Sequence, residues 1–257
     1  MKSCPDIRGA RAAAKRLVVE YGIDQPNLID IESIAFDRGV VVRKAAIDGA
    51  EAWLLRKGNK GIIRVNSRIQ EIGRERFAVT HELGHWELHK LLTQLQRCTT
   101  RDIHAYRGSD AEIEANTFAA ELLMPSELLT SYMQHEVSIG AVQKISQDFQ
   151  TTLTASAIRF VEESTDDCYV VFSCNGIITW WRRKETGSGF WITPGQPLSS
   201  ESIAWDCNRT PDYPKPMAEV PPEAWFPSNR EARNNQVWEQ SVILGEYDVV
   251  LTLLCVV

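Results

Sequence analysis

The stretch RFAVTHELGHWELHK (residues 76–90) places two histidines four positions apart, with a glutamate directly after the first. On an α-helix, residues four apart lie one above the other on the same face, so His81 and His85 can both reach one metal ion. Neutral imidazoles bind zinc at about 2.0–2.1 Å, and a helix presents two of them without distorting its backbone. Glu82 then stands close to that metal, where a general base is needed to activate water. The spacing predicts a zinc-dependent hydrolytic site.

The residues around this motif are compatible with a helix. Six apolar side chains recur broadly at the helical period: Ile69, Ile72, Phe77, Leu83, Trp86 and Leu88. Gly84 is the exception, because a glycine inside a helix costs about 1 kcal/mol relative to alanine. Either another backbone packs closely against Gly84, or a substrate needs the space. A surface helix that carries two histidines by chance is the alternative, and a third metal ligand would argue against it.

A second helix with a candidate third ligand is predicted downstream, in SDAEIEANTFAAELLMP (residues 109–125). It starts with a capping serine and closes at a proline. Its core face is formed by Ile113, Phe118, Ala119, Leu122 and Leu123. Glu114 lies one turn before Phe118 and so belongs to this face, where a carboxylate is costly unless it is paired or bound to metal. Glu112 and Glu121 are expected on the solvated side of the helix.

These segments together resemble the ImmA/IrrE family of zinc metallopeptidases. The resemblance is carried by IIRVNSRIQEIGRERFAVTHELGHWELHK (residues 62–90) and EIEANTFAAELLMP (residues 112–125). Upstream, ARAAAKRLVVEYGIDQPNLIDIESIAFDRGVVV (residues 10–42) is similar to the opening helix of that family, its turn and its second helix, which lead into a small sheet. The likeness covers roughly residues 5–160, and the paired motifs are specific.

The resemblance implies a chemistry and a class of substrate. In that family the histidines of the motif and a glutamate of the second helix hold zinc, which corresponds here to His81, His85 and Glu114, with Glu82 as the base. Its members are typically intracellular proteases that cut a helix-turn-helix repressor, often encoded nearby, and so switch on stress or mobile-element genes. We therefore expect a cytoplasmic, zinc-dependent endopeptidase that acts on such a repressor.

A non-catalytic regulator is the alternative function. Such a protein would keep the fold and sequester a partner, or sense a ligand through its C-terminal part. The intact set of His81, Glu82, His85 and Glu114 favours the enzyme, because a non-catalytic protein has no chemical need for Glu82.

A further catalytic donor is expected between the two metal helices, in RDIHAYRGSD (residues 101–110). The anionic tetrahedral intermediate of peptide hydrolysis needs a hydrogen-bond donor besides zinc. His104, Tyr106 and Arg107 are available on what is expected to be a loop, with surface polarity as the alternative explanation, and we select Tyr106. His89, four residues after His85, is expected to support the site rather than bind the metal.

The pattern of elements predicts an α+β fold in three parts. A zincin-like metallopeptidase domain is expected over residues 1–125, a helical helix-turn-helix-like segment over residues 126–164, and a β-rich C-terminal domain over residues 165–257. In the first part, helices are predicted over residues 10–21 and 28–37, followed by strands over residues 39–44, 51–56 and 61–65. Residues 126–134 are expected to form one helix.

Charge disfavours DNA binding by the middle segment. VSIGAVQKISQDFQTTLTASAIRFVEE (residues 137–163) reads as two short helices around a polar turn. Phosphate contacts need a basic surface, yet Lys144 and Arg159 are outnumbered by acidic residues: Glu127, Glu136, Asp148, Glu162 and Glu163. The chain as a whole has a net charge of -6. A role in docking the protein substrate or covering the cleft is therefore preferred over direct DNA binding.

Strands are predicted for most of the C-terminal part. They correspond to CYVVFSCNGIITWWRR (residues 168–183), SGFWITPG (residues 188–195) and EYDVVLTLLCVV (residues 246–257), with a buried strand at the end. Six of the eight tryptophans follow residue 175: Trp180, Trp181, Trp191, Trp205, Trp225 and Trp238. Aromatic residues in a small β-domain are core more often than ligand pocket, so a core role is expected.

Bulk properties agree with an intracellular globular protein. The chain has 257 residues, 44% of them hydrophobic, which is enough for a sizeable core. Its start, MKSCPDIRGARAAAKR, lacks the apolar segment of a secretory signal, and the nine apolar residues at its end fall short of the roughly 20 that span a bilayer. Six cysteines without a C-x-x-C pattern are expected to be reduced, buried thiols rather than disulfides or zinc ligands.

Overall fold

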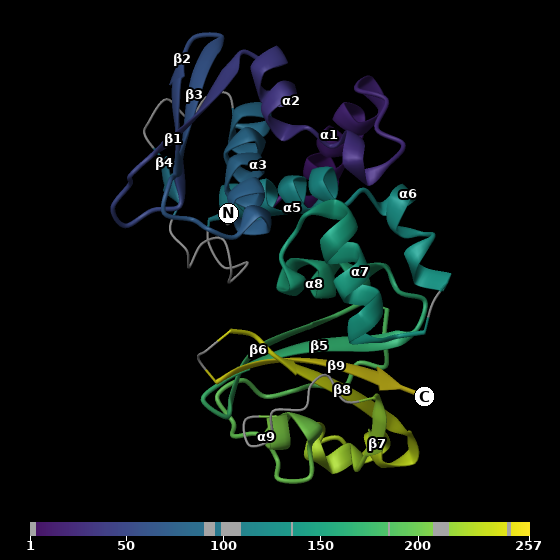
Figure 1. Cartoon of the computed structure of the whole chain (residues 1–257). Coiled ribbons are helices and arrows are strands. Elements are labelled where there is room, and N and C mark those ends of the chain that lie inside the picture. The colour runs from purple at the N-terminus through teal and green to yellow at the C-terminus, as the bar shows by residue number, and fades with distance from the viewer. Residues whose placement is uncertain are drawn as a thin grey trace. The chain divides into compact units, whose positions relative to one another are not determined.

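The structure is a computed structural model, and it describes residues 4–89, 96–98, 109–134, 136–184, 186–207, 216–245 and 248–257. Two units are distinguished: unit 1 comprises Met1–Leu128 and Ser146–Thr152, and unit 2 comprises Leu129–Ile145 and Leu153–Val257. Helices and two separate sheets make this a mixed α+β fold, which confirms the predicted class (Figure 1). The helical middle segment of the sequence is shared between the two units, and the three-part division stays a prediction.

Unit 1 opens with helices whose starts are set by aspartate caps. Its helices are α1 (Ile7–Glu20), α2 (Ile31–Asp37), α3 (Ile72–Leu88) and α5 (Asp110–Leu123), and its strands are β1 (Val40–Ala45), β2 (Ala52–Lys57), β3 (Lys60–Asn66) and β4 (Gln96–Cys98). The side chain of Asp6 accepts a hydrogen bond from the backbone N of Gly9, and Asp30 does the same for Ser33. The helix predicted over residues 28–37 therefore begins only at Ile31, after a 3₁₀ turn at Pro26–Leu28.

The sheet of unit 1 supports the helix that carries the two histidines. Its strand order is β1-β3-β2-β4, with β1 parallel to β3 and the other neighbours antiparallel. Helix α3 packs against β2 and β3, as Figure 1 shows. Trp86 of α3 stacks under the guanidinium of Arg56, 3.8 Å from the ring centroid, and its Nε1 donates to the carbonyl of Arg38. Gly61 makes room for this ring, because a Cβ there would lie 2.8 Å from it.

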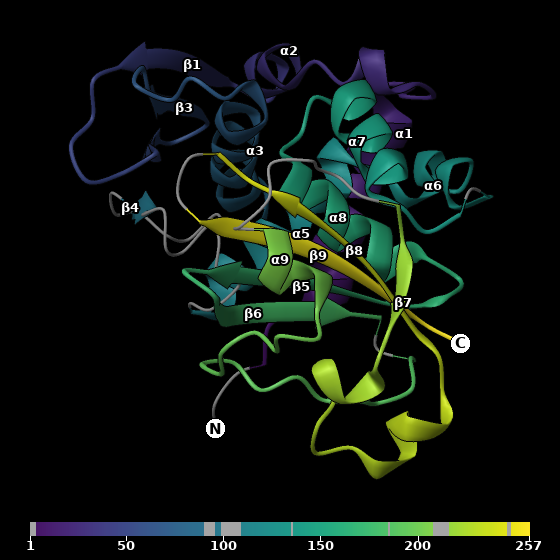
Figure 2. The ribbon, with the colours of Figure 1, turned by 60° about the horizontal axis from the view of Figure 1, so that its bottom comes forward.

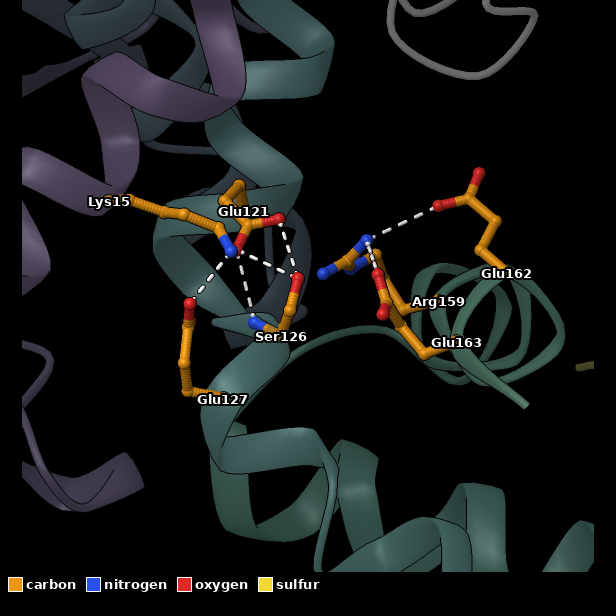
Figure 3. A network of polar contacts seen from close by, with 7 residues as sticks. All are labelled: Lys15, Glu121, Ser126, Glu127, Arg159, Glu162 and Glu163. Atoms are coloured by element: carbon orange, nitrogen blue, oxygen red, sulfur yellow. Dashed lines mark hydrogen bonds and ion pairs between the residues drawn. The ribbon is translucent and has the colours of Figure 1, made fainter. Parts of the chain in front are cut away.

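A buried glutamate joins α5 to the turn that follows it, where the sequence analysis expected a solvated side chain. Glu121 is 1% exposed, and its Oε1 accepts hydrogen bonds from the backbone N and the Oγ of Ser126, at 3.1 and 2.9 Å (Figure 3). Lys15 of α1 lies 3.9 Å from the same carboxylate and 2.7 Å from Glu127. The solvated placement of Glu121 is therefore wrong, because its charge has partners inside unit 1.

The helix predicted over residues 126–134 is shorter than expected. Helix α6 covers only Ser126–Leu129, and a 3₁₀ turn follows at Tyr132–Gln134. Thr130 and Ser131 separate the two, and such residues compete for backbone hydrogen bonds in non-helical conformations. The two helices predicted further on are present as α7 (Ile139–Phe149) and α8 (Leu153–Glu163).

Unit 2 is organised around one antiparallel sheet. Its strands are β5 (Asp167–Cys174), β6 (Ile177–Arg183), β7 (Ala218–Val220), β8 (Val237–Ile243) and β9 (Val249–Val256), in the order β6-β5-β9-β8-β7, with the short helix α9 (Ile203–Cys207). Helix α8 packs on β5 and β6, and α9 packs on β8 and β9 from the opposite face; Figure 2 turns the α9 side towards the viewer. The strand predicted at the end of the chain is confirmed by β9 and its buried residues.

Two expectations for unit 2 need correction. Residues 188–195 do not form a strand, although Phe190 and Ile192 are buried, because both side chains fill the core from a loop. Strand β8 was missed, since Glu239, Gln240 and Ser241 at its centre are polar and yet buried. These polar side chains have specific partners, which no periodicity in the sequence reveals.

Three of the six tryptophans that follow residue 175 contribute to the core of unit 2, as expected. Trp225 is 2% exposed within the main apolar cluster, and Trp181 and Trp205 pack against that cluster. Trp191 differs, with 61% of its surface exposed.

A buried ion pair removes one of the two basic residues from the surface of the middle segment. Arg159 of α8 is 2% exposed, and its Nη1 lies 3.3 Å from Glu162 and 2.9 Å from Glu163 (Figure 3). Its charge is therefore not offered to a phosphate backbone.

Within the described ranges, no helix combines the length and apolarity that crossing a bilayer requires.

Removing the carboxylate of Glu239 is expected to destabilise unit 2. Glu239 is fully buried and accepts hydrogen bonds from Ala204 N at 2.6 Å, Trp225 Nε1 at 2.7 Å and Ser241 Oγ at 3.0 Å. Glu239→Ala leaves these donors without an acceptor, which should lower the free energy of unfolding by about 2 kcal/mol or more. Urea denaturation followed by tryptophan fluorescence measures the change. The exposed Glu201→Ala is the control, and equal stability of both variants would contradict the structural role of Glu239.

Candidate metal centre

Two helices of unit 1 approach each other closely at the histidine motif. At Gly84 of α3, an added Cβ would lie 3.2 Å from both Cα and O of Ala115 and 3.1 Å from a ring carbon of Phe118, both on α5. Of the two explanations considered for this glycine, the close approach of another backbone is the one found. The face of α3 that carries His81 and His85 is therefore brought directly against α5.

One glutamate of α5 lies between the two histidines. The Nε2 of His81 is 3.1 Å from Oε2 of Glu112, and the Nε2 of His85 is 3.4 Å from Oε1 of the same carboxylate. The two Nε2 atoms are 3.1 Å apart. Both imidazoles are at most 1% exposed, so three potential metal donors converge in a buried position.

The geometry of these donors fits zinc. Four ligands placed at 2.0–2.1 Å around a tetrahedral centre are separated by roughly 3.3 Å. The two Nε2 atoms are 3.1 Å apart, and each lies 3.1 or 3.4 Å from one oxygen of the Glu112 carboxylate. Two imidazoles and one carboxylate are also a donor set that catalytic zinc sites use. The residues present therefore suit a zinc ion by number, chemistry and spacing.

Glu114, expected as the third ligand, is placed elsewhere. Its Oε2 lies 2.8 Å from Nε2 of His89, and its Oε1 accepts a hydrogen bond from the backbone N of Asp6 at 2.7 Å. Two residues along a helix correspond to a rotation of about 200°, so Glu112 and Glu114 face different directions. The structure brings Glu112 to the histidine pair. The expectation that Glu112 lies on the solvated side of the helix is therefore wrong.

Asn116 is the supporting residue that the sequence analysis overlooked. It is fully buried on α5, and its Oδ1 lies 2.8 Å from Nδ1 of His81. Asn116 follows Glu112 by four positions, so the two share one helix face. That spacing was the available signal for choosing Glu112 over Glu114.

Burial and mutual interactions shift the pKa values of His81, His85 and Glu112. Burial lowers the pKa of His81, but the hydrogen bond to Glu112 and the charge of Glu82 outweigh it and raise this pKa above its ordinary value. For His85, burial dominates and the pKa is lowered. Burial raises the pKa of Glu112, yet its close contacts with both histidines bring this pKa well below the ordinary range. The Glu112 carboxylate is therefore favoured in its ionised form, which is the form that binds a metal ion.

Of the two expected catalytic residues, the structure describes Glu82 but not Tyr106. Glu82 is fully buried on α3, and its charge influences His81, so it lies within electrostatic range of the metal donors. Tyr106, together with His104 and Arg107, lies outside the described residues.

Part of the chain matches a known family model. Residues 35–160 match the family model described as IrrE N-terminal-like domain, a peptidase family, which confirms the predicted resemblance. An "Uncharacterized immunity region protein 2" of Bacillus phage phi105 is 35% identical over 88 residues. This match covers 34% of the chain and 51% of the phage protein, so the chain spans about half the length of that curated relative.

A solved structure shares the fold over almost the whole chain. It is a Mycobacterium tuberculosis transcriptional regulator, with a TM-score of 0.63 and 16% sequence identity. The superposition covers 96% of this chain and 76% of the regulator. At this identity the likeness concerns the fold alone.

Enlarging Gly84 is expected to separate the two helices. Gly84→Val places a branched side chain against the backbone of Ala115, and such overpacking should lower the free energy of unfolding by about 1–3 kcal/mol. Gly140→Val is the matched control, because the nearest atom to a Cβ at this helical glycine is 3.7 Å away. Chemical denaturation of both variants measures the difference. Unchanged stability of Gly84→Val would show that the close approach is not a constraint.

Proposed function

We propose that this chain is a zinc-dependent endopeptidase acting on a protein substrate, on the premise that residues 35–160 match the IrrE N-terminal-like peptidase family model. The observation that carries the proposal is the convergence of His81, His85 and Glu112 at 3.1–3.4 Å beside the buried Glu82. A buried cluster of two imidazoles and a carboxylate has a direct chemical use as a metal site.

We assign the metal ligands to His81, His85 and Glu112. A zinc ion held there would polarise the substrate carbonyl and would make a bound water more acidic. The two histidines bind through Nε2, since the Nδ1 of His81 faces Asn116 and the Nδ1 of His85 faces His89. Glu112 contributes its carboxylate from the facing helix, so both α3 and α5 are needed for the site.

Glu82 is proposed as the general base. Its carboxylate takes a proton from water as the oxygen of that water forms a bond to the peptide carbonyl carbon. When the carbon–nitrogen bond then breaks, Glu82 delivers this proton to the leaving amine nitrogen. Its position directly after His81 and its complete burial support this role, because a buried carboxylate is poorly hydrated and available for proton transfer. Tyr106 remains the proposed donor to the oxyanion, on its place in the sequence between α3 and α5.

The substrate is proposed to be a helix-turn-helix transcriptional repressor. The phage relative is named for an immunity region and the structural neighbour is a transcriptional regulator, and both names fit a function in gene control. Cleavage of the repressor would switch on stress or mobile-element genes and would take place in the cytoplasm. The acidic net charge of -6 and the burial of Arg159 favour binding of a protein over direct binding of DNA.

Loss of Glu112 is expected to weaken zinc binding strongly. Glu112→Ala removes one of three protein ligands, so zinc affinity should fall by more than the roughly 10–100-fold caused by losing a supporting residue. Metal analysis and chelator competition on the purified protein provide the measurement. Glu87→Gln is the control and should keep full affinity. Glu87 lies on α3, as the two histidines do, but its ion pair is with Arg38. Zinc retained by Glu112→Ala but lost by Glu114→Ala would restore Glu114 as the ligand.

Replacing the base should stop cleavage while leaving the site intact. Glu82→Gln keeps the size of the side chain but removes its proton acceptor, so turnover should fall by about 10²–10⁴-fold with unchanged zinc content. Co-expression with a repressor encoded next to the gene, followed by a blot for its fragments, is the assay. A Glu82→Gln variant that relieves repression as well as the unmodified protein would favour the alternative, a regulator that sequesters its partner.

A further inference from the structure

A line of hydrogen bonds leads from one proposed zinc ligand to the start of α1. The Nδ1 of His85 lies 3.0 Å from Nδ1 of His89. The Nε2 of His89 lies 2.8 Å from Oε2 of Glu114, and Oε1 of Glu114 accepts a hydrogen bond from the backbone N of Asp6 at 2.7 Å. All four residues belong to unit 1, and both His89 and Glu114 are largely buried.

The chemistry of the two ends determines the direction of this line. The carboxylate of Glu114 accepts hydrogen bonds, so His89 donates its Nε2–H to it. In a neutral imidazole the other nitrogen is then an acceptor, and Nδ1 of His89 accepts from Nδ1–H of His85. The proton of His85 is thereby held on Nδ1, which leaves the lone pair of its Nε2 directed towards His81 and Glu112.

We propose that His89 and Glu114 are positioning residues that fix the tautomer and ring orientation of His85 for metal binding. This inference rests on the zinc site of the proposed function, and it assigns Glu114 a role one step removed from the metal. A histidine ligand whose second nitrogen donates to an acceptor is both oriented and made more basic by it.

The two histidine ligands are supported in different ways. His81 has a direct acceptor, the amide oxygen of Asn116 at 2.8 Å. His85 instead has an imidazole acceptor, whose own orientation depends on the carboxylate of Glu114. The effect of Glu114 on the metal should therefore be transmitted only through His89, and this dependence distinguishes a positioning residue from a ligand.

A double-mutant cycle on zinc affinity tests this dependence. Zinc affinity of the metal-free full-length chain is measured by chelator competition, and the visible spectrum of the Co²⁺-loaded protein reports ligand geometry. His89→Leu, which removes the acceptor for His85, should weaken zinc binding roughly 10–100-fold and alter the Co²⁺ spectrum. His89→Gln should retain most of the affinity, because its amide oxygen can still accept from Nδ1–H of His85.

The second side of the cycle concerns Glu114. Glu114→Gln should weaken zinc binding in the unmodified background, whereas the double variant His89→Leu/Glu114→Gln should bind zinc no more weakly than His89→Leu alone. Glu87→Gln is the control on α3 and should leave both affinity and spectrum unchanged. Thermal unfolding of each metal-free variant is measured in parallel, so that a loss of folding is separated from a loss of affinity.

Specific outcomes would overturn the inference. Unchanged zinc affinity in His89→Leu would remove His89 from the site, and additive effects of the two substitutions would show that Glu114 acts independently of His89. An equal loss in His89→Gln and His89→Leu would assign the effect to packing rather than to the tautomer. An unmodified protein that binds no zinc would overturn the proposed function itself, whereas zinc binding without repressor cleavage would leave this inference standing.

Discussion

The close approach of α3 and α5 at Gly84 is the constraint on which the candidate metal centre depends. Ala115 and Phe118 of α5 lie where any side chain at position 84 would project, so the two helix backbones meet at the level of the histidines. Each helix by itself offers an incomplete set of donors: α3 contributes two imidazoles to the group, and α5 contributes the carboxylate of Glu112. Only their contact brings the two imidazole nitrogens within 3.1 Å of each other and within 3.1–3.4 Å of the carboxylate oxygens of Glu112.

Burial makes this grouping chemically significant. Two imidazoles and a carboxylate that are removed from water interact strongly, because little solvent screens them. Glu112 is held ionised by His81 and His85, and each histidine has its remaining nitrogen engaged by another side chain. The polar groups around the centre thus fix which atoms face inward. A site of this kind has the order that metal binding requires before any ion arrives.

Unit 2 also contains buried polar side chains that are held by hydrogen bonds. Its sheet carries polar residues in the middle of β8, and these are tolerated because each has a partner: Glu239 receives donors from α9 and from Trp225, and Gln240 accepts from the backbone N of Ile139. Buried polar groups with satisfied hydrogen bonds specify one arrangement of helices on a sheet. The family match ends at residue 160, so this arrangement belongs largely to the part of the chain beyond that match.

The sequence by itself determined the helix that carries His81, Glu82 and His85, the short strands before it and the peptidase family, because these follow from local spacing and apolar periodicity. It also raised the correct question about Gly84. Only the tertiary structure decided which glutamate meets the histidines, since Glu112 and Glu114 lie on one helix about 200° apart and either could face α3 until the packing is known. Strand β8 was likewise hidden, because its polar centre is buried through partners distant in sequence. Local patterns predict elements, whereas contacts between distant elements choose the side chains that form the site.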